Sequence, residues 1–114
     1  MQIFLSQEGQ ALVARIKGEL DLSTADRLRE ELEAGISHAR PRVLYLDLAG
    51  VSFMDSSGLG VILGRYRRLA GEGGKIVICR PQPQIQRLLE LSGISKLVEI
   101  VAEDAESCSR KEVR

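Results

Sequence analysis

Two serines beside an aspartate are the residues of this chain best placed to carry out chemistry. They stand in the run Asp55-Ser56-Ser57-Gly58, which follows an apolar segment and precedes a segment with helical periodicity. Side-chain oxygens of Asp and Ser accept hydrogen bonds from the unpaired amides of a helix's first turn, so this run predicts a helix cap. A phosphate on one of these hydroxyls would meet free N–H groups and the positive end of the helix dipole. The run therefore fits two roles, a plain cap and a cap that is also a phosphorylation switch.

The segments on either side predict the elements that position these serines. Residues 43–48 are rich in Val, Leu and Tyr, which is typical of a buried strand. Beyond the serines, apolar residues recur at steps of three and four and predict a helix with one stripe facing the core. The stripe consists of Leu59, Ile62, Leu63, Tyr66, Leu69 and Ala70. The serines are thus expected at a turn from strand to helix.

The residues before this unit predict two antiparallel strands and a first helix. Residues 3–6 and 11–17 predict short strands around a turn at residues 8–10. Residues 18–22 are expected to form a loop, and Ser23-Thr24-Ala25-Asp26 fits a capping box that starts the helix. The helix is expected to end before Pro41. Its apolar stripe consists of Ala25, Leu28, Leu32 and Ile36, and its solvated face of Arg27, Arg29, Glu30, Glu31 and Glu33.

The residues after the central helix complete a single α/β domain. Residues 75–79 predict a strand, a short helix follows Pro83 and ends at Gly93, and residues 97–101 predict a last strand. Strands that alternate with single helices predict a central, mostly parallel mixed sheet of about five strands with three to four helices. A chain of 114 residues fits one domain. Residues 105–114 belong to a polar tail in which Ala102, Ala105 and Cys108 indicate a weak final helix that frays before Arg114, and we expect this tail to be dispensable for the switch.

The composition narrows the classes of partner. Sixteen basic and sixteen acidic residues cancel, so no global field attracts nucleic acid or an anionic membrane. Residues 1–5 do not resemble a signal peptide and no apolar run approaches the length of a membrane span, so we expect a cytoplasmic protein. Cys79 and Cys108 are far apart in the sequence, which favours reduced thiols over a metal site or a redox pair. No cofactor is expected.

Glycine-rich segments offer an alternative interpretation as a nucleotide site. Gly58 to Gly64 follows a strand and opens a helix, as a dinucleotide fingerprint does, but it comes after the third strand of a very short domain. Residues 71–75 resemble a phosphate loop but precede a strand, so no helix N-terminus would face a phosphate. Close backbone approach by the sheet or a partner explains Gly58 and Gly60, and close helix packing explains Gly64. A small nucleotide-binding or hydrolysing domain is the less favoured alternative.

Catalysis by the chain itself has little support in the sequence. A serine nucleophile needs a base within hydrogen-bond reach, and the only histidine, His38, is expected at the far end of the first helix. Arg65, Arg67 and Arg68 lack interleaved aromatic residues, which favours a solvated face or a partner contact over a nucleic-acid site. The residues therefore favour a binding switch over an enzyme.

Three stretches of the chain resemble a known family. They are FMDSSGLGVILGRYR over residues 53–67, GELD over residues 18–21 and LLELSGISKLVEI over residues 88–100. These stretches resemble the bacterial anti-sigma-factor antagonists, whose fold is called the STAS domain, and most closely their sporulation branch. The resemblance covers most of the chain and implies the same α/β architecture.

The resemblance implies a switch and its partners. It implies that a protein kinase, which is also the anti-sigma factor, phosphorylates the second serine of the D-S-S-G turn, Ser57 here. The unphosphorylated antagonist would bind the kinase and release the sigma factor, and phosphorylation would block this binding until a protein phosphatase restores the serine. A stress-response antagonist, or another STAS regulatory module with a different kinase, is the alternative. We expect a monomer that contacts neither nucleic acid nor membrane.

The resemblance also implies a partner surface at the starts of the first two helices. Its residues are Asp21, Ser23, Thr24, Asp55, Ser56, Ser57, Gly58, Leu59, Gly60 and Ile62. In the sporulation branch a pair of histidines follows GELD, whereas Leu22 and Ser23 follow it here. The contacts made by this loop are therefore expected to differ in detail.

Overall fold

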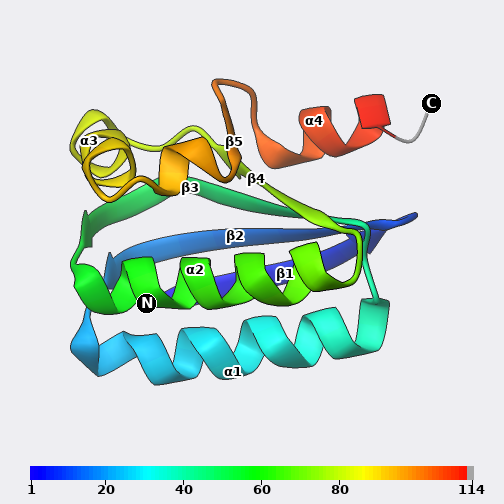
Figure 1. Ribbon diagram of the computed structural model, residues 1–114, viewed down its shortest axis with the longest axis horizontal. Coiled ribbons are helices and arrows are strands. Elements are labelled where there is room, and N and C mark those ends of the chain that lie inside the picture. Colours follow the sequence, from blue (N-terminus) through cyan, green and yellow to red (C-terminus); the bar gives the residue numbers. More distant parts are fainter. Residues whose placement is uncertain (113–114) are drawn as a thin grey trace.

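A five-stranded mixed sheet with helices on both faces organises the described part of the chain (Figure 1). The computed structural model describes the backbone of residues 1–112 and the side chains of residues 1–111. The elements are β1 (Gln2–Glu8), β2 (Ala11–Leu20), α1 (Leu22–Ala39), β3 (Val43–Met54), α2 (Ser56–Gly71), β4 (Lys75–Cys79), α3 (Pro83–Leu91), the 3-10 turn η1 (Ile94–Lys96), β5 (Glu99–Val101) and α4 (Ala105–Glu112). Strand β1 is antiparallel to β2, and the remaining neighbours are parallel. The predicted order of elements and the α/β class are confirmed.

The two faces of the sheet carry separate apolar clusters. The larger cluster joins alternate residues of the strands to α1, α2 and α3, and α1 and α2 run side by side in Figure 1. The smaller cluster, on the other face, is closed by α4. The predicted stripe of α1 is buried throughout. In α2 the stripe is shifted, since Val61 is buried and Ala70 is exposed.

Strands β2 and β3 extend further than their sequences suggest. Leu20 is in register with Met54, so the loop predicted for residues 18–22 is wrong and its first three residues belong to β2. The pairing is irregular after Arg15 and after Gly18, and such bulges interrupt the alternation that reveals a strand. Gly18 has a φ of 112°, a conformation that favours glycine. The long strands bring the starts of α1 and α2 to the same end of the sheet.

The C-terminal segment forms a final helix, as the sequence indicated, and the described part of this helix packs against the sheet. Ala105 is fully buried in the smaller cluster, with Tyr45 among its members. The buried carboxylate of Asp47 accepts hydrogen bonds from the Ala105 amide (3.2 Å) and the Arg80 guanidinium (2.9 Å), which holds the start of α4 against β3. Helix α4 therefore covers apolar surface, and the expectation that this segment is dispensable for the switch stays a prediction. The last two residues of the predicted tail, 113–114, lie outside the described residues.

Candidate functional site

The starts of α1 and α2 meet where β2 and β3 end. The Asp55 amide donates a hydrogen bond to the carbonyl oxygen of Leu20 (3.1 Å), which ties the start of α2 to the end of β2. Parallel neighbouring strands end at the same edge, and in α/β sheets this edge commonly carries the binding site. The structure thus brings the two predicted parts of the partner surface together, at the left-hand end of Figure 1.

At the start of α1, every polar side chain takes part in the cap. Asp21 is the N-cap, and its carboxylate accepts hydrogen bonds from the Ser23 amide (2.9 Å) and the Ser23 hydroxyl (2.6 Å). The Thr24 hydroxyl accepts from the Asp21 amide (3.0 Å) and donates to the carbonyl of Glu19 (2.9 Å). The predicted capping box of Ser23 and Asp26 is therefore wrong, and the box is formed by Asp21 and Thr24. The hydrogen bond from the Ser23 hydroxyl is the main cause that lowers the pKa of Asp21.

At the start of α2, the cap leaves two hydroxyls unused. Asp55 is the N-cap, as predicted, and its carboxylate accepts from the amides of Ser57 (2.8 Å) and Gly58 (3.4 Å). Among the described residues no hydrogen bond engages the hydroxyl of Ser56 or Ser57. Ser56 is exposed and Ser57 is half-buried. Both are the first residues of a helix that supplies free amides and a positive dipole end.

The glycines of α2 have different roles. A Cβ atom on Gly58 would lie 2.8 Å from Met54 Cγ and 2.9 Å from the Leu20 carbonyl oxygen, so the predicted close approach of the sheet is confirmed there. A Cβ atom on Gly60 or Gly64 would meet nothing within 4 Å. The prediction of close helix packing is therefore wrong for Gly64. Gly60 is exposed and the sheet does not approach it, so the partner contact suggested for it stays a prediction.

Two of the predicted contact residues differ in exposure. Ile62 is only 1% exposed and belongs to the larger cluster, so its side chain is part of the core and cannot touch a partner in this structure. Leu59 is half-buried and packs against the same cluster, which leaves part of its side chain at the surface. Residues on the core side of a helix are not available to a partner, so the buried stripe and the partner surface of α2 must use different positions.

The arginines that follow the Asp55–Gly58 turn hold α1 and α2 together. Arg65 Nε lies 2.6 Å from Glu33 Oε1, and Arg68 also pairs with Glu33 and reaches the Ser37 hydroxyl (3.1 Å). Burial lowers the pKa of Arg65. The assignment of Glu33, Arg65 and Arg68 to a solvated face is therefore wrong, because these side chains bridge two helices. Arg67 is exposed.

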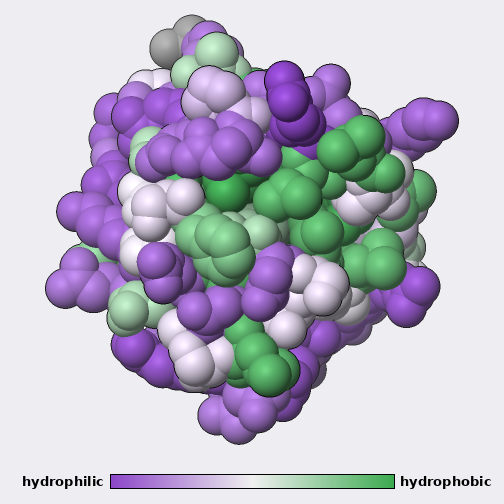
Figure 2. All heavy atoms as spheres, turned by 90° about the vertical axis from the view of Figure 1, so that its left-hand side faces the viewer, coloured by the Kyte–Doolittle hydropathy of each residue, from purple (hydrophilic) through white to green (hydrophobic). Residues whose placement is uncertain are grey.

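Exposed apolar side chains at this end of the molecule were not predicted. Figure 2 shows them gathered among polar residues on the face that carries the helix starts and α3. Leu22, at the start of α1, is 81% exposed, and Phe53, two residues before Asp55, is 49% exposed. Leu91, at the end of α3, is 80% exposed. The strand predicted for residues 43–48 ended before the stretch VSFM, so the sequence did not indicate which of these side chains faces outward.

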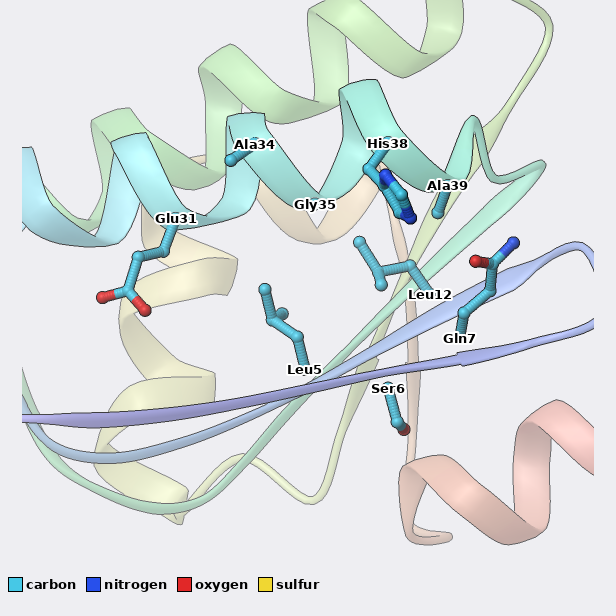
Figure 3. A pocket seen from close by; sticks show the side chains of 9 residues that line it. All are labelled: Leu5, Ser6, Gln7, Leu12, Glu31, Ala34, Gly35, His38 and Ala39. Carbon is cyan, nitrogen blue, oxygen red and sulfur yellow. The ribbon is translucent and has the colours of Figure 1, made fainter.

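His38 lies on a different side of the molecule from the serine turn. It borders a cavity of about 430 Å³ between β1 and α1, whose walls include Leu5, Leu12 and Gly35 (Figure 3). Ser6 also borders this cavity, but its side chain points away from His38, on the other side of the strands in Figure 3. His38 is exposed at the end of α1, as predicted, and forms no serine–histidine pair in this cavity.

Within the described residues, other kinds of site lack their residues. No three His, Cys, Asp or Glu side chains gather there in a way that could hold a metal ion. Cys79 is a buried free cysteine, and burial raises the pKa of its thiol to about 12. None of the helices described has the length and apolar character that crossing a membrane requires.

Proteins with similar sequences are named as anti-sigma factor antagonists. An anti-sigma F factor antagonist of Paenibacillus polymyxa is 36% identical over 113 residues, which cover 99% of this chain and 97% of that protein. An anti-sigma-B factor antagonist of Listeria monocytogenes is 36% identical over 85 residues, which cover 75% of this chain and 74% of that protein. These homologues are antagonists, and the resemblance noted in the sequence is confirmed.

Solved structures give the same fold. The Bacillus cell fate determinant SpoIIAA in its phosphorylated form is 28% identical, with a TM-score of 0.76 and coverage of 99% of this chain and 100% of that one. An anti-sigma factor antagonist from Mycobacterium paratuberculosis, 24% identical over 96% of this chain and 92% of that one, has a TM-score of 0.83 and supports the fold alone. A family model described as the STAS domain matches residues 2–107. This chain therefore belongs to the STAS domain family.

Proposed function

We propose that the chain is an anti-sigma factor antagonist whose partner binding is switched by phosphorylation of the turn that starts α2. The observation that carries this proposal is the pair of unengaged hydroxyls of Ser56 and Ser57 at the amino end of a capped helix. The names of the relatives support it, and so does the existence of a phosphorylated form of the similar SpoIIAA. The partner surface comprises this turn, the neighbouring start of α1, and the exposed parts of Leu59 and Gly60.

The switch acts at the surface and leaves the fold nearly unchanged. A phosphate adds about −1.5 to −2 charges at neutral pH, and the amides and dipole of α2 stabilise it on the chain itself. In the complex the dianion would lie beside Asp55 and be pressed against groups arranged for a neutral hydroxyl. Loss of hydration without compensating donors costs several kcal/mol, which corresponds to about a hundredfold weaker binding or more.

The acceptor is one of two adjacent serines. The family resemblance led to Ser57, and this assignment stays a prediction. Accessibility favours Ser56, because it is the exposed residue of the pair whereas Ser57 is half-buried. A kinase must enclose the acceptor hydroxyl, so the difference in exposure bears directly on the site of modification.

The chemistry belongs to the partners. An anti-sigma factor that is also a serine kinase transfers the γ-phosphoryl group of ATP to the serine hydroxyl and releases ADP and the hydroxyl proton. A protein phosphatase hydrolyses the phosphoserine and restores the binding form. We place these reactions in the cytoplasm, where ATP is available to the kinase.

The identity of the partner separates the two branches of the proposal. A relative that matches over 99% of this chain with 36% identity is an anti-sigma F factor antagonist, which favours the sporulation branch. The stress-response branch is the second candidate, because an anti-sigma-B factor antagonist has the same identity over a shorter range. Calorimetric titration of the chain with an anti-sigma F and with an anti-sigma-B kinase would distinguish them.

The proposal is tested by incubating the chain with the anti-sigma factor kinase and ATP, followed by peptide mass spectrometry. We expect one phosphate per chain within the peptide that contains Ser56 and Ser57. The variants Ser56→Ala and Ser57→Ala, assayed separately, identify the acceptor as the one whose loss abolishes incorporation. Absence of phosphate from the wild-type turn, with an active kinase shown on its own antagonist, would refute the proposed switch.

A further inference from the structure

A groove lies directly beside the switch turn, between the end of β3 and helix α3. It has a volume of about 560 Å³ and we call it the α3 groove. It is lined by Ser52, Phe53, Met54, Pro83, Gln84, Ile85, Arg87, Leu88 and Leu91. Its buried floor includes Met54 and Ile85, whereas Phe53 and Leu91 are 49% and 80% exposed.

The apolar character of the α3 groove is what marks it as a contact surface. Single exposed apolar side chains are ordinary, but Phe53, Leu88 and Leu91 line one concave site together. Large apolar side chains of a partner that enter such a groove lose their contact with water, and they become the anchors of the interface. The neighbouring surface is polar, as Figure 2 shows, which gives the site a rim.

The charge on the α3 groove selects among partners. Among the described residues that line the α3 groove, only Arg87 is charged. Its side chain forms no ion pair with another described residue. The Gln84 amide already donates to the Gln82 side chain (2.8 Å) and the Ser52 carbonyl (3.4 Å). A partner segment that carries a carboxylate next to its apolar side chains therefore complements the groove.

The position of the α3 groove connects it to the switch. Phe53 and Met54 are the last residues of β3, and Asp55 follows them as the cap of α2. The Met54 side chain also lies directly beneath Gly58. A partner segment seated in the groove is therefore continuous with a contact at Ser56 and Ser57.

We propose that the α3 groove is a docking site for an acidic, amphipathic segment of the anti-sigma factor. Large apolar side chains of that segment insert between Phe53 and Leu91, and a carboxylate pairs with Arg87. This inference rests on the proposed function and extends it, because it assigns part of the binding to a surface that carries no phosphoacceptor. Docking in the groove orients the partner before the turn is phosphorylated.

The chain offers a matched pair of phenylalanines for the test. Phe53→Ala removes an anchor of the groove, and Phe4→Ala removes a phenylalanine of nearly equal exposure, 51%, on the edge strand β1. Calorimetric titration with the anti-sigma factor should show at least tenfold weaker binding for Phe53→Ala and a change within twofold for Phe4→Ala. Leu91→Ser repeats the test at a side chain so exposed that its loss leaves the core intact.

The charge is tested in the same way. Arg87→Glu should weaken binding at least tenfold, whereas Arg42→Glu, an exposed arginine before the start of β3, should leave it within twofold.

Wild-type affinity in both Phe53→Ala and Leu91→Ser, with binding still weakened by Ser57→Asp or Ser56→Asp, would overturn the docking site and leave the proposed function standing. A wild-type chain that binds no anti-sigma factor would overturn both. A concentration-dependent dimer that Phe53→Ala abolishes without affecting the anti-sigma factor would assign the groove to a second copy and also overturn the proposal.

Discussion

Helices α1 and α2 begin side by side and each has an aspartate as its N-cap, but they use their hydroxyl groups differently. At α1, the hydroxyls of Ser23 and Thr24 are both engaged, one by the Asp21 carboxylate and the other by the carbonyl of Glu19. At α2, the Asp55 carboxylate serves only backbone amides, and the hydroxyls of Ser56 and Ser57 are not engaged among the described residues.

The difference shows which serine of a cap is available for modification. A hydroxyl that completes a cap is held in place by its acceptor, so a phosphate there would disrupt the helix start that it belongs to. A hydroxyl left over by the cap can take a phosphate while the carboxylate keeps the helix start in place. The start of α1 is therefore expected to be a fixed contact surface, and the start of α2 the part that changes.

The largest effect on stability is expected from Gly58, where α2 rests on the end of β2. In Gly58→Ala the new Cβ would lie within 3 Å of the Leu20 carbonyl oxygen, so the helix start must shift. Such overpacking costs about 1–3 kcal/mol of the free energy of unfolding, which chemical denaturation measures. Gly60→Ala is the control, because a Cβ atom at this position meets no other atom within 4 Å. Alanine also has a higher helix propensity than glycine, so the free energy of unfolding of this variant should rise by up to about 1 kcal/mol. Equal stability of the two variants would show that the two helix starts are not coupled through this contact.

The cap of α2 should contribute to stability without taking part in the modification. Asp55→Ala leaves the amides of Ser57 and Gly58 without their acceptor and should lower the free energy of unfolding by about 1 kcal/mol. Asp55→Asn, which keeps an acceptor oxygen, should recover most of this loss. Thermal melting should therefore give the highest melting temperature for the wild type, a slightly lower one for Asp55→Asn and the lowest for Asp55→Ala. An unchanged melting temperature for Asp55→Ala would show that the carboxylate does not stabilise the helix start.

The cap of α1 should show its carboxylate in a pH dependence. The folded-state pKa of Asp21 is lowered, so its contribution is present above the unfolded pKa, about 4, and is lost as the pH falls through the folded pKa. The melting temperature of Asp21→Ala should lie below that of the wild type at pH 7, and the difference should shrink below about pH 4. A difference independent of pH would contradict the role of the carboxylate.

Binding of the anti-sigma factor should also weaken in Asp21→Ala. Unchanged affinity would show that Asp21 is not part of the interface.

The smallest effect is expected from the serine hydroxyl at the start of α1. Ser23→Ala loses one exposed hydrogen bond to Asp21, and the melting temperature should change by no more than about 3 °C. The amount of phosphate incorporated by the kinase should stay that of the wild type. A loss of incorporation would show that the engaged hydroxyl of α1 is also an acceptor, which would abolish the difference between the two helix starts.

The turn between β3 and α2 could be predicted because strand, cap and helix each leave a local signal. Asp55 is a cap former directly after an apolar strand, and the periodicity of α2 starts behind it. The cap of α1 could not be chosen in this way, since Asp21 with Thr24 and Ser23 with Asp26 are both acceptable capping boxes. Only the length of β2, which depends on pairing with β3 through a bulge, decides between them.

Local sequence patterns could not predict the burial or exposure of side chains that depends on contacts between residues far apart in the sequence. Ala105 is buried in the smaller cluster, and its amide donates a hydrogen bond to the Asp47 carboxylate 58 positions earlier. The polar segment indicated a weak helix but gave no sign of these contacts. Ile62 lies on the core side of α2, although the sequence resemblance placed it on the partner surface. Phe53 faces outward at the end of an irregular strand, where alternation does not assign a side.

The central claim is that a phosphate on the start of α2 prevents binding without altering the fold. It is tested most directly by calorimetry of the anti-sigma factor with the unmodified chain and with the stoichiometrically phosphorylated chain, with backbone chemical shifts recorded for both. We predict an affinity at least about a hundredfold lower after phosphorylation, with shift changes confined to residues around the two helix starts. An affinity that phosphorylation leaves unchanged, or shift changes across the whole sheet, would contradict a local switch at Ser56 and Ser57.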